Sequence, residues 1–186
     1  MHTARLSLLA RMAHPGERSV HLACGIDRLG FIDLACGLTT VLTDVNTSSL
    51  EILAQQLADL EHRWGPVPGV AHFRLMPVEA LASPEGFPPD SIQHFTLQNL
   101  FNAQLHPARA YPAILDPLLS RITDRGTLFL TESEAAVLET RARVHGIPLL
   151  LLGRASGYYD EDVIMLQVRK PSPFPFTSPS PIMRSH

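Results

Sequence analysis

Gly25 and Asp44 are the two residues of the chain whose types and spacing suit a nucleoside ligand. Gly25 follows a short apolar stretch, and a glycine there lets the backbone approach a ligand closely. Asp44 ends a second apolar stretch about 20 residues later, where a carboxylate can accept hydrogen bonds from both hydroxyls of a ribose. The alternatives are that Gly25 is a plain turn glycine and that Asp44 caps the following helix at residues 46–49.

These two residues require a strand–turn–helix–strand unit to bring them together. We expect a strand from residue 19, a tight turn at Gly25, a helix over residues 27–34 closed by Gly37, and a strand over residues 40–44. The helix N-terminus would offer free N–H groups to an anionic group. Only Gly30 follows Gly25 at the fingerprint spacing and no Gly-Lys-Ser/Thr occurs, so neither the full dinucleotide fingerprint nor a P-loop is present.

The rest of the chain alternates strands and helices. Expected strands cover residues 70–76, 91–97, 127–131, 147–152 and 162–168, and expected helices cover residues 3–13, 50–64, 110–122 and 133–145 with a single turn at 78–82. Pro117 should kink or split its helix, and residues 124–126 should form a turn. This order predicts an α/β fold: a Rossmann-like, doubly wound, mostly parallel seven-stranded sheet with an antiparallel edge strand.

Residues 20–27 resemble the first motif of the class I S-adenosylmethionine-dependent methyltransferases, hydrophobic-acid-hydrophobic-Gly-x-Gly-x-Gly. Gly25 takes the place of the central glycine. His21 stands where the family has its acid, and Ala23 and Asp27 stand where it has the outer glycines. Four later segments resemble further motifs of this family in the right order: 42–46, 76–81, 87–93 and 118–130. The resemblance covers residues 19–169.

The resemblance implies that S-adenosylmethionine binds at the carboxyl ends of the strands, with Asp44 on the ribose. The implied cofactor-binding residues are His21, Ala23, Cys24, Gly25, Asp27, Asp44, Val45, Val78, Glu79, Leu97 and Gln98. Asp27 either replaces the missing acid or simply caps its helix. Pro77 stands where the family often has an acid for the adenine amino group, so the Val78 backbone N–H and the Glu79 carboxylate are the candidates for that contact.

The function implied is transfer of the sulfonium methyl group to a small-molecule acceptor by in-line displacement. Such a reaction depends mainly on positioning, and no catalytic residue stands out. One alternative is an inactive methyltransferase-like protein that serves as a binding or regulatory partner. Another is an enzyme that uses the same site for a different adenosine-bearing ligand.

Composition limits the remaining possibilities. The 186 residues, 45% of them hydrophobic, suit one domain over residues 1–170, followed by a Pro/Ser-rich tail over 171–186 that is expected to be disordered. A formal charge of −3 without a basic run argues against a nucleic-acid partner, and no apolar stretch is long enough to span a membrane. The nine histidines show no metal-ligand spacing. Two cysteines, expected to be reduced, favour the cytoplasm; the oligomeric state stays open.

Overall fold

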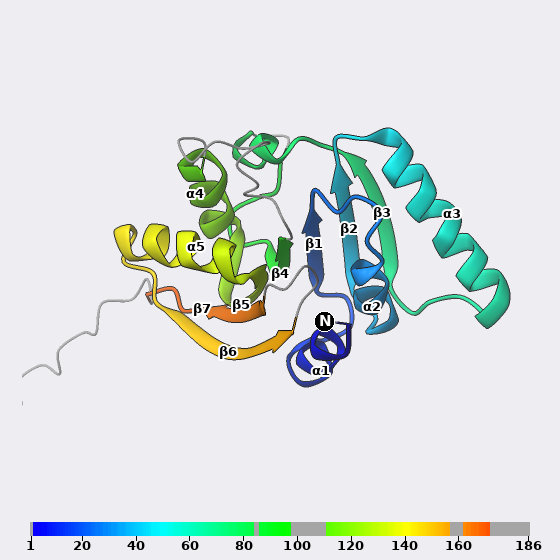
Figure 1. Ribbon diagram of the computed structural model, residues 1–186, viewed down its shortest axis with the longest axis horizontal. Coiled ribbons are helices and arrows are strands. Elements are labelled where there is room, and N and C mark those ends of the chain that lie inside the picture. Colours follow the sequence, from blue (N-terminus) through cyan, green and yellow to red (C-terminus); the bar gives the residue numbers. More distant parts are fainter. Residues whose placement is uncertain (1, 84–85, 98–110, 157–161, 172–186) are drawn as a thin grey trace, which may run out of the picture.

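The computed structural model describes residues 2–83, 86–97, 111–156 and 162–171 (Figure 1). Seven strands form one sheet in the order β3-β2-β1-β4-β5-β7-β6. The strands are β1 (Arg18–Leu22), β2 (Thr39–Asp44), β3 (Val70–Leu75), β4 (Ile92–Leu97), β5 (Ile122–Thr131), β6 (Leu149–Ser156) and β7 (Asp162–Val168). The helices are α1 (His2–Met12), α2 (Leu29–Ala35), α3 (Thr47–Trp64), η1 (Val78–Ala82), α4 (Tyr111–Arg121) and α5 (Glu132–Val144).

The pairing of the strands confirms the predicted fold class. Strands β3, β2, β1, β4 and β5 run parallel to one another, and β7 pairs antiparallel with both β5 and β6. The sheet order reverses between β1 and β4, so their carboxyl ends, together with that of β2, form the edge at which doubly wound sheets bind ligands. Among the described residues, no helix is both long and apolar enough to cross a bilayer.

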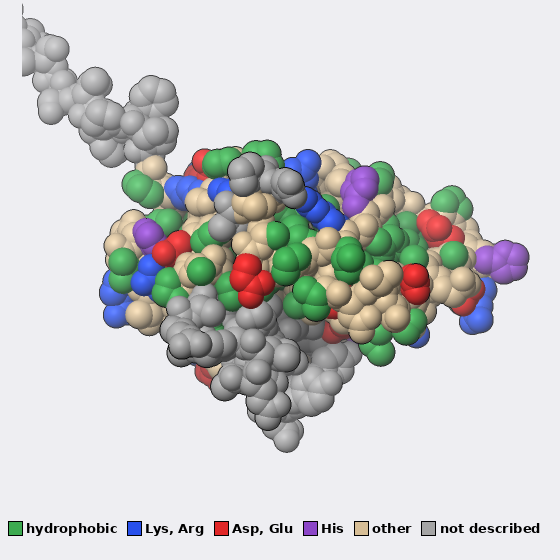
Figure 2. All heavy atoms as spheres, turned by 90° about the horizontal axis from the view of Figure 1, so that it is seen from above, with side chains coloured by type: hydrophobic (Ala, Val, Ile, Leu, Met, Phe, Trp, Pro, Cys, Tyr) green, Lys and Arg blue, Asp and Glu red, His purple; other side chains and the backbone are tan. Residues whose placement is uncertain are grey.

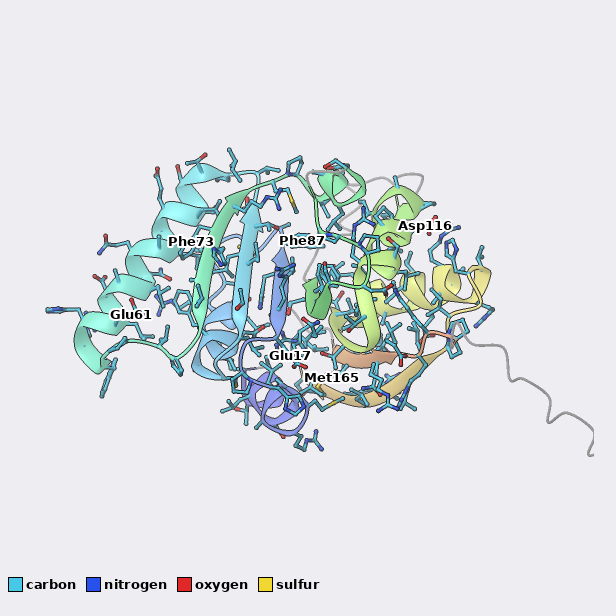
Figure 3. All side chains as sticks on the ribbon, turned by 180° about the vertical axis from the view of Figure 1, so that it is seen from behind. Glu17, Glu61, Phe73, Phe87, Asp116 and Met165 are labelled. Atoms are coloured by element: carbon cyan, nitrogen blue, oxygen red, sulfur yellow. The ribbon has the colours of Figure 1, made fainter. Side chains whose placement is uncertain are left out.

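Helices cover both faces of the sheet, and the alternation of each strand decides which residues face which layer. Helices α1, α2 and α3 lie on one face, which we call the α1 face, where Leu8, Leu34 and Leu53 are buried. Elements η1, α4 and α5 lie on the other, the α4 face, where Leu81, Leu118 and Leu138 are buried in the largest core cluster. Figure 3, seen from behind, labels Glu17 just before β1 and Met165 on β7, both near α1.

Helix α3 shows how the chain leaves β2 immediately after Asp44. Its N-cap is Asn46, whose side chain accepts a hydrogen bond from the Ser48 N–H at 3.0 Å. The helical spacing of Leu50, Leu53, Leu57 and Leu60 predicts one buried face; the first three are buried and Leu60 is partly buried. The cap and the buried face together fix the direction of the crossover, and hence the position of the strand end that carries Asp44.

Some predicted boundaries are wrong. Helix α2 begins at Leu29 rather than at residue 27, because the Asp27 side chain accepts a hydrogen bond from the Leu29 N–H at 2.8 Å. The turn expected at residues 124–126 is part of β5, where the Gln167 side chain donates to the Arg125 carbonyl and Arg125 adopts a φ of 62°. Helix α4 continues through Pro117 without being split. The predictions for residues 172–186 and for Gln98 lie outside the described residues.

Candidate functional site

Gly25 and Asp44 are in direct contact at the carboxyl edge of the sheet. The Gly25 N–H donates to Asp44 Oδ2 at 2.7 Å, and the Asn46 N–H donates to Asp44 Oδ1 at 2.8 Å. Since a carboxylate has about four lone-pair positions, each oxygen of Asp44 keeps capacity for another hydrogen bond. Asp44 therefore stabilises its own turn, and its carboxylate is fixed at this edge in a residue that is 8% exposed.

The loop after β1 keeps the backbone of a glycine-rich turn. Ala23 has a φ of 49° and Gly25 a φ of 54°, both in the left-handed region. A Cβ added at Gly25 would meet nothing within 4 Å. Hydrogen bonds from the Cys24 N–H to the Thr43 carbonyl and from the Asp27 N–H to the Cys24 carbonyl hold the loop against β2. Ala23 thus adopts the conformation that the related motif reserves for glycine, and open space remains above Gly25.

Cys24 lies inside this loop but is not a nucleophile. Burial, reinforced by the negative charge of Asp44, raises the pKa of its thiol to about 12. A thiol with that pKa is protonated near neutral pH, and the thiolate is the reactive form. Cys24 and Cys36 are both free cysteines.

The Asp27 side chain contacts the backbone at the start of α2. Its Oδ1 accepts the Leu29 N–H and lies 3.9 Å from His2 Nε2 on α1. Its side chain is about a quarter exposed. Of the two roles considered from the sequence, Asp27 accepts the N–H of Leu29, the first residue of α2, although the N-cap residue of that helix is Arg28. A ligand contact from the exposed part of Asp27 stays a prediction.

His21 points into the protein beneath the loop, toward α2. Its Nε2 lies 2.9 Å from Asp33 Oδ2, and Asp33 also binds the guanidinium of Arg5 on α1. All three side chains are buried. Arg5 and Asp33 were missed by the sequence reasoning, although Asp33 is the one charged residue of the apolar helix α2, which is a signal for a buried pair.

Apolar side chains flank Asp44 on the side of the neighbouring strands. Three apolar side chains are exposed here: Val45 follows β2, Ile26 lies in the loop after β1, and Leu75 is the last residue of β3. Figure 2 looks onto this edge from above and shows hydrophobic side chains gathered across its middle. A nucleobase, which needs apolar contacts on its faces, suits such a surface.

The remaining predicted residues lie along the same edge in different environments. Val78 is buried in the first turn of η1, and Glu79 beside it is exposed. Leu97 ends β4 and is fully buried, and Gln98 lies outside the described residues. No group of three or more His, Cys, Asp or Glu side chains that could hold a metal ion occurs within the part of the chain that the structure describes.

Comparisons with known proteins agree with this architecture. No protein-family model matches the chain, and no curated protein matches it. Among solved structures, magnesium protoporphyrin IX methyltransferase (ChlM) from Synechocystis PCC 6803, with bound SAM, has a TM-score of 0.66 and 16% identity, covering 91% of this chain and 79% of that one.

Two further solved structures resemble the chain over most of their length. SMU.1697c from Streptococcus mutans, in complex with SAH, has a TM-score of 0.62 and 11% identity, covering 89% of this chain and 96% of that one. An rRNA methylase from Streptococcus thermophilus has a TM-score of 0.60 and 17% identity, covering 90% and 95%. The chain therefore has the class I methyltransferase fold.

Proposed function

We propose that this protein is an S-adenosylmethionine-dependent methyltransferase whose cofactor lies across the carboxyl ends of β2, β1 and β4. The observation that carries the proposal is the pairing of Gly25 with Asp44, which sets a fixed carboxylate beside a backbone turn that a ligand can approach. Two neighbours of the same fold contain SAM or SAH in their solved structures. Their likeness supports the choice of ligand.

The residues present fit this ligand part by part. The Asp44 carboxylate would accept the ribose hydroxyls, and the exposed side chain of Val45 would contact the base. The left-handed backbone at Ala23 and Gly25 leaves room for the part of the ligand that passes over β1. The bound group would supply an electrophilic methyl on a sulfonium. The protein's contribution is to hold that group and its acceptor in line and to exclude water, which accounts for much of the rate in such reactions.

The acceptor class is argued from charge. The formal charge is −3, and Asp27 and Glu79 are described acidic residues at the carboxyl edge; the exposed Arg28 follows Asp27, and Glu132 is paired with Arg154 at 2.8 Å. This sign favours a small or cationic acceptor over a polyanion. The rRNA methylase among the structural neighbours means that the comparisons do not support the expected absence of a nucleic-acid partner. A small-molecule acceptor is therefore our proposal on electrostatic grounds alone.

Isothermal titration with S-adenosylmethionine and S-adenosylhomocysteine tests the proposal. We expect micromolar binding by the wild-type protein and a loss of at least about tenfold in affinity for Asp44→Ala, because charge-assisted hydrogen bonds to the ribose disappear. Asp59→Ala, an exposed position on α3, is the matched control and should bind normally. Thermal unfolding of each variant checks that the fold is retained.

The outcomes separate the alternatives. Absence of binding at millimolar ligand would contradict the enzyme and favour a methyltransferase-shaped binding protein. Binding of adenosine or ATP in preference to both SAM and SAH would instead favour another adenosine-bearing ligand at the same site.

A further inference from the structure

Arg5 of α1 lies at the centre of a buried polar cluster on the α1 face of the sheet. Its Nε and Nη2 donate to the two oxygens of Asp33 at 3.0 Å and 2.6 Å, and Nη2 also donates to the Ser19 hydroxyl at 3.3 Å. The guanidinium carbon lies 5.2 Å from the centroid of the Phe129 ring. These hydrogen bonds use three of the five N–H groups of a guanidinium and leave the two of Nη1.

The Nη1 group of Arg5 is buried and has no hydrogen-bond partner among the described residues. Because Nε and the inner N–H of Nη2 lie on the side of Asp33, Nη1 points away from that carboxylate. The contacts with Ser19 of β1 and Phe129 of β5 place the guanidinium over β4, which lies between these two strands in the sheet. An unpaired N–H of a buried cation is costly, so an acceptor is expected over β4.

The strand register shows which side chains of β4 lie beneath the guanidinium. On the α1 face, Thr96 is paired with Phe129, and His94 is paired with Ser19. Paired residues on neighbouring strands are about 5 Å apart and point to the same face of the sheet. Thr96 and His94 are therefore the residues of β4 that the Arg5 guanidinium covers.

Of these two residues, only Thr96 can accept a further hydrogen bond. Both ring nitrogens of His94 have partners, the Thr127 hydroxyl at 2.7 Å from Nδ1 and Glu17 Oε2 at 3.0 Å from Nε2. The Thr96 hydroxyl is buried and, like Arg5 Nη1, has no hydrogen-bond partner within the described part of the chain. A donor and an acceptor thus lie over the same strand without a direct hydrogen bond between them.

We propose that one buried water molecule joins Arg5 Nη1 to the Thr96 hydroxyl. A water accepts a hydrogen bond from the guanidinium and donates one to the hydroxyl oxygen, and two bonds of ordinary length span up to about 5.5 Å. Buried waters in proteins characteristically satisfy polar groups that lack a protein partner. This water links α1 to β4, as Asp33 links α1 to α2. The inference is independent of the proposed function.

The charges around the site favour a water over an anion. Burial by itself would raise the pKa of Asp33, but Arg5 and His21 hold it well below its usual range, so Asp33 is ionised and neutralises Arg5. Burial, together with the charge of Arg5, lowers the pKa of His94, and this ring is uncharged near pH 7. An anion at the site would therefore be a buried charge without a counterion, which is strongly unfavourable.

A crystal structure of the wild-type protein, at a resolution that shows ordered water, tests the proposal directly. We expect one density peak within about 3.2 Å of both Arg5 Nη1 and the Thr96 oxygen. A direct hydrogen bond between the two groups, another protein acceptor at Nη1, or a peak with the density of a chloride ion would overturn the proposal. A structure with no peak at this position would overturn it as well.

Thr96→Val and Thr40→Val form a matched pair for urea denaturation. Each removes a buried hydroxyl that has no partner among the described residues and keeps the side-chain shape, but Thr40 lies on β2, between Ser19 and Ala71 in the register. We expect Thr96→Val to lower the folding equilibrium constant by roughly 5- to 150-fold, because the water loses its acceptor and Arg5 its bridge. Thr40→Val should not lower it.

A third variant shows whether Thr96 acts through Arg5. In the double variant Arg5→Met with Asp33→Leu, the donor to the water is absent, so adding Thr96→Val should cost less than about twofold. An equal cost in both backgrounds would overturn the inference, as would a Thr96→Val variant as stable as the wild-type protein. If the variants fold too poorly for denaturation, the crystal structure of the wild-type protein decides alone.

Discussion

The two faces of the sheet differ in chemistry although helices cover both. On the α4 face the central strands present Val20, Leu22, Phe95, Leu97 and Leu128, all buried in one apolar core. On the α1 face the same strands present a different set, also buried: Ser19, His21, His94, Thr96 and Thr127. Central strands of a doubly wound sheet usually read as continuous apolar runs. The difference shows that polar residues alternating along such strands can indicate a buried polar layer instead of a face exposed to solvent.

The largest effect should follow from breaking the ion pair of the α1 face. Asp33→Ala leaves the Arg5 guanidinium buried without its carboxylate, and we expect a loss of about 3–5 kcal/mol in the free energy of unfolding, measured by urea denaturation. The double variant Arg5→Met with Asp33→Leu should lose less than Asp33→Ala, because no buried charge is left unpaired. A double variant less stable than the single variant would contradict this explanation.

Acid should destabilise the protein in part through the buried groups of the α1 face. Burial, helped by the charge of Arg5, lowers the pKa of His94, and the pKa of Asp33 is also below its usual range. In both cases the unfolded chain takes up the proton first, so the free energy of unfolding should fall as the pH drops below about 6.5 for His94 and below about 4 for Asp33.

Urea denaturation between pH 8 and pH 3 measures this dependence. The double variant Arg5→Met with Asp33→Leu, which lacks the carboxylate, should show a shallower decline below pH 4 than the wild-type protein. Other carboxylates with lowered pKa values, such as Asp116, are present in both proteins and cancel in the difference. Equal slopes would show that Asp33 does not contribute.

Two isosteric substitutions sharpen the comparison within the α1 face. Thr127→Val removes the partner of His94 Nδ1, which lies 2.7 Å from the Thr127 hydroxyl, and should cost about 1–3 kcal/mol. Thr40→Val should be neutral or stabilising by about 1 kcal/mol, because the buried Thr40 hydroxyl has no partner among the described residues. Thermal unfolding of the pair measures the contrast. Equal losses would mean that only side-chain shape, not hydrogen bonding, matters on this face.

The smallest expected effect concerns the loop at the edge between the two faces. Ala23→Gly relieves a left-handed alanine but adds freedom to the unfolded chain, so a gain of at most about 1 kcal/mol is expected. Gly25→Ala should lose about 1–2 kcal/mol for the opposite reason, even though its Cβ has open space. A loss for Ala23→Gly would contradict the assignment of strain to this position.

Much of the fold could be predicted from the sequence because its signals are local. The spacing of Leu50, Leu53, Leu57 and Leu60 and the cap at residues 46–49 predicted α3. The glycine and the strand-end acid predicted that Gly25 and Asp44 lie close together, but not that they are hydrogen-bonded to each other. The order of strands and helices was enough for the doubly wound sheet.

The polar cluster could not be predicted because its members are far apart in the chain. Arg5 and Asp33 meet only when α1 and α2 pack together on the sheet, and neither helix shows the pairing alone. Likewise, the Arg125 carbonyl in the irregular first half of β5 accepts a hydrogen bond from Gln167, a residue of the last strand. The binding roles given to the loop residues stay predictions, since their test is a ligand measurement.

The contact of Arg5 with Phe129 has a consequence for how the chain assembles. The guanidinium lies 5.2 Å from the centroid of that ring, on a strand synthesised long after α1, β1 and α2. Phe129 belongs to β5, so the burial of the Arg5–Asp33 ion pair is complete only when β5 has joined the sheet. The dehydration cost of this pair of the first two helices is therefore offset by burial of apolar surface that includes a strand far along the chain.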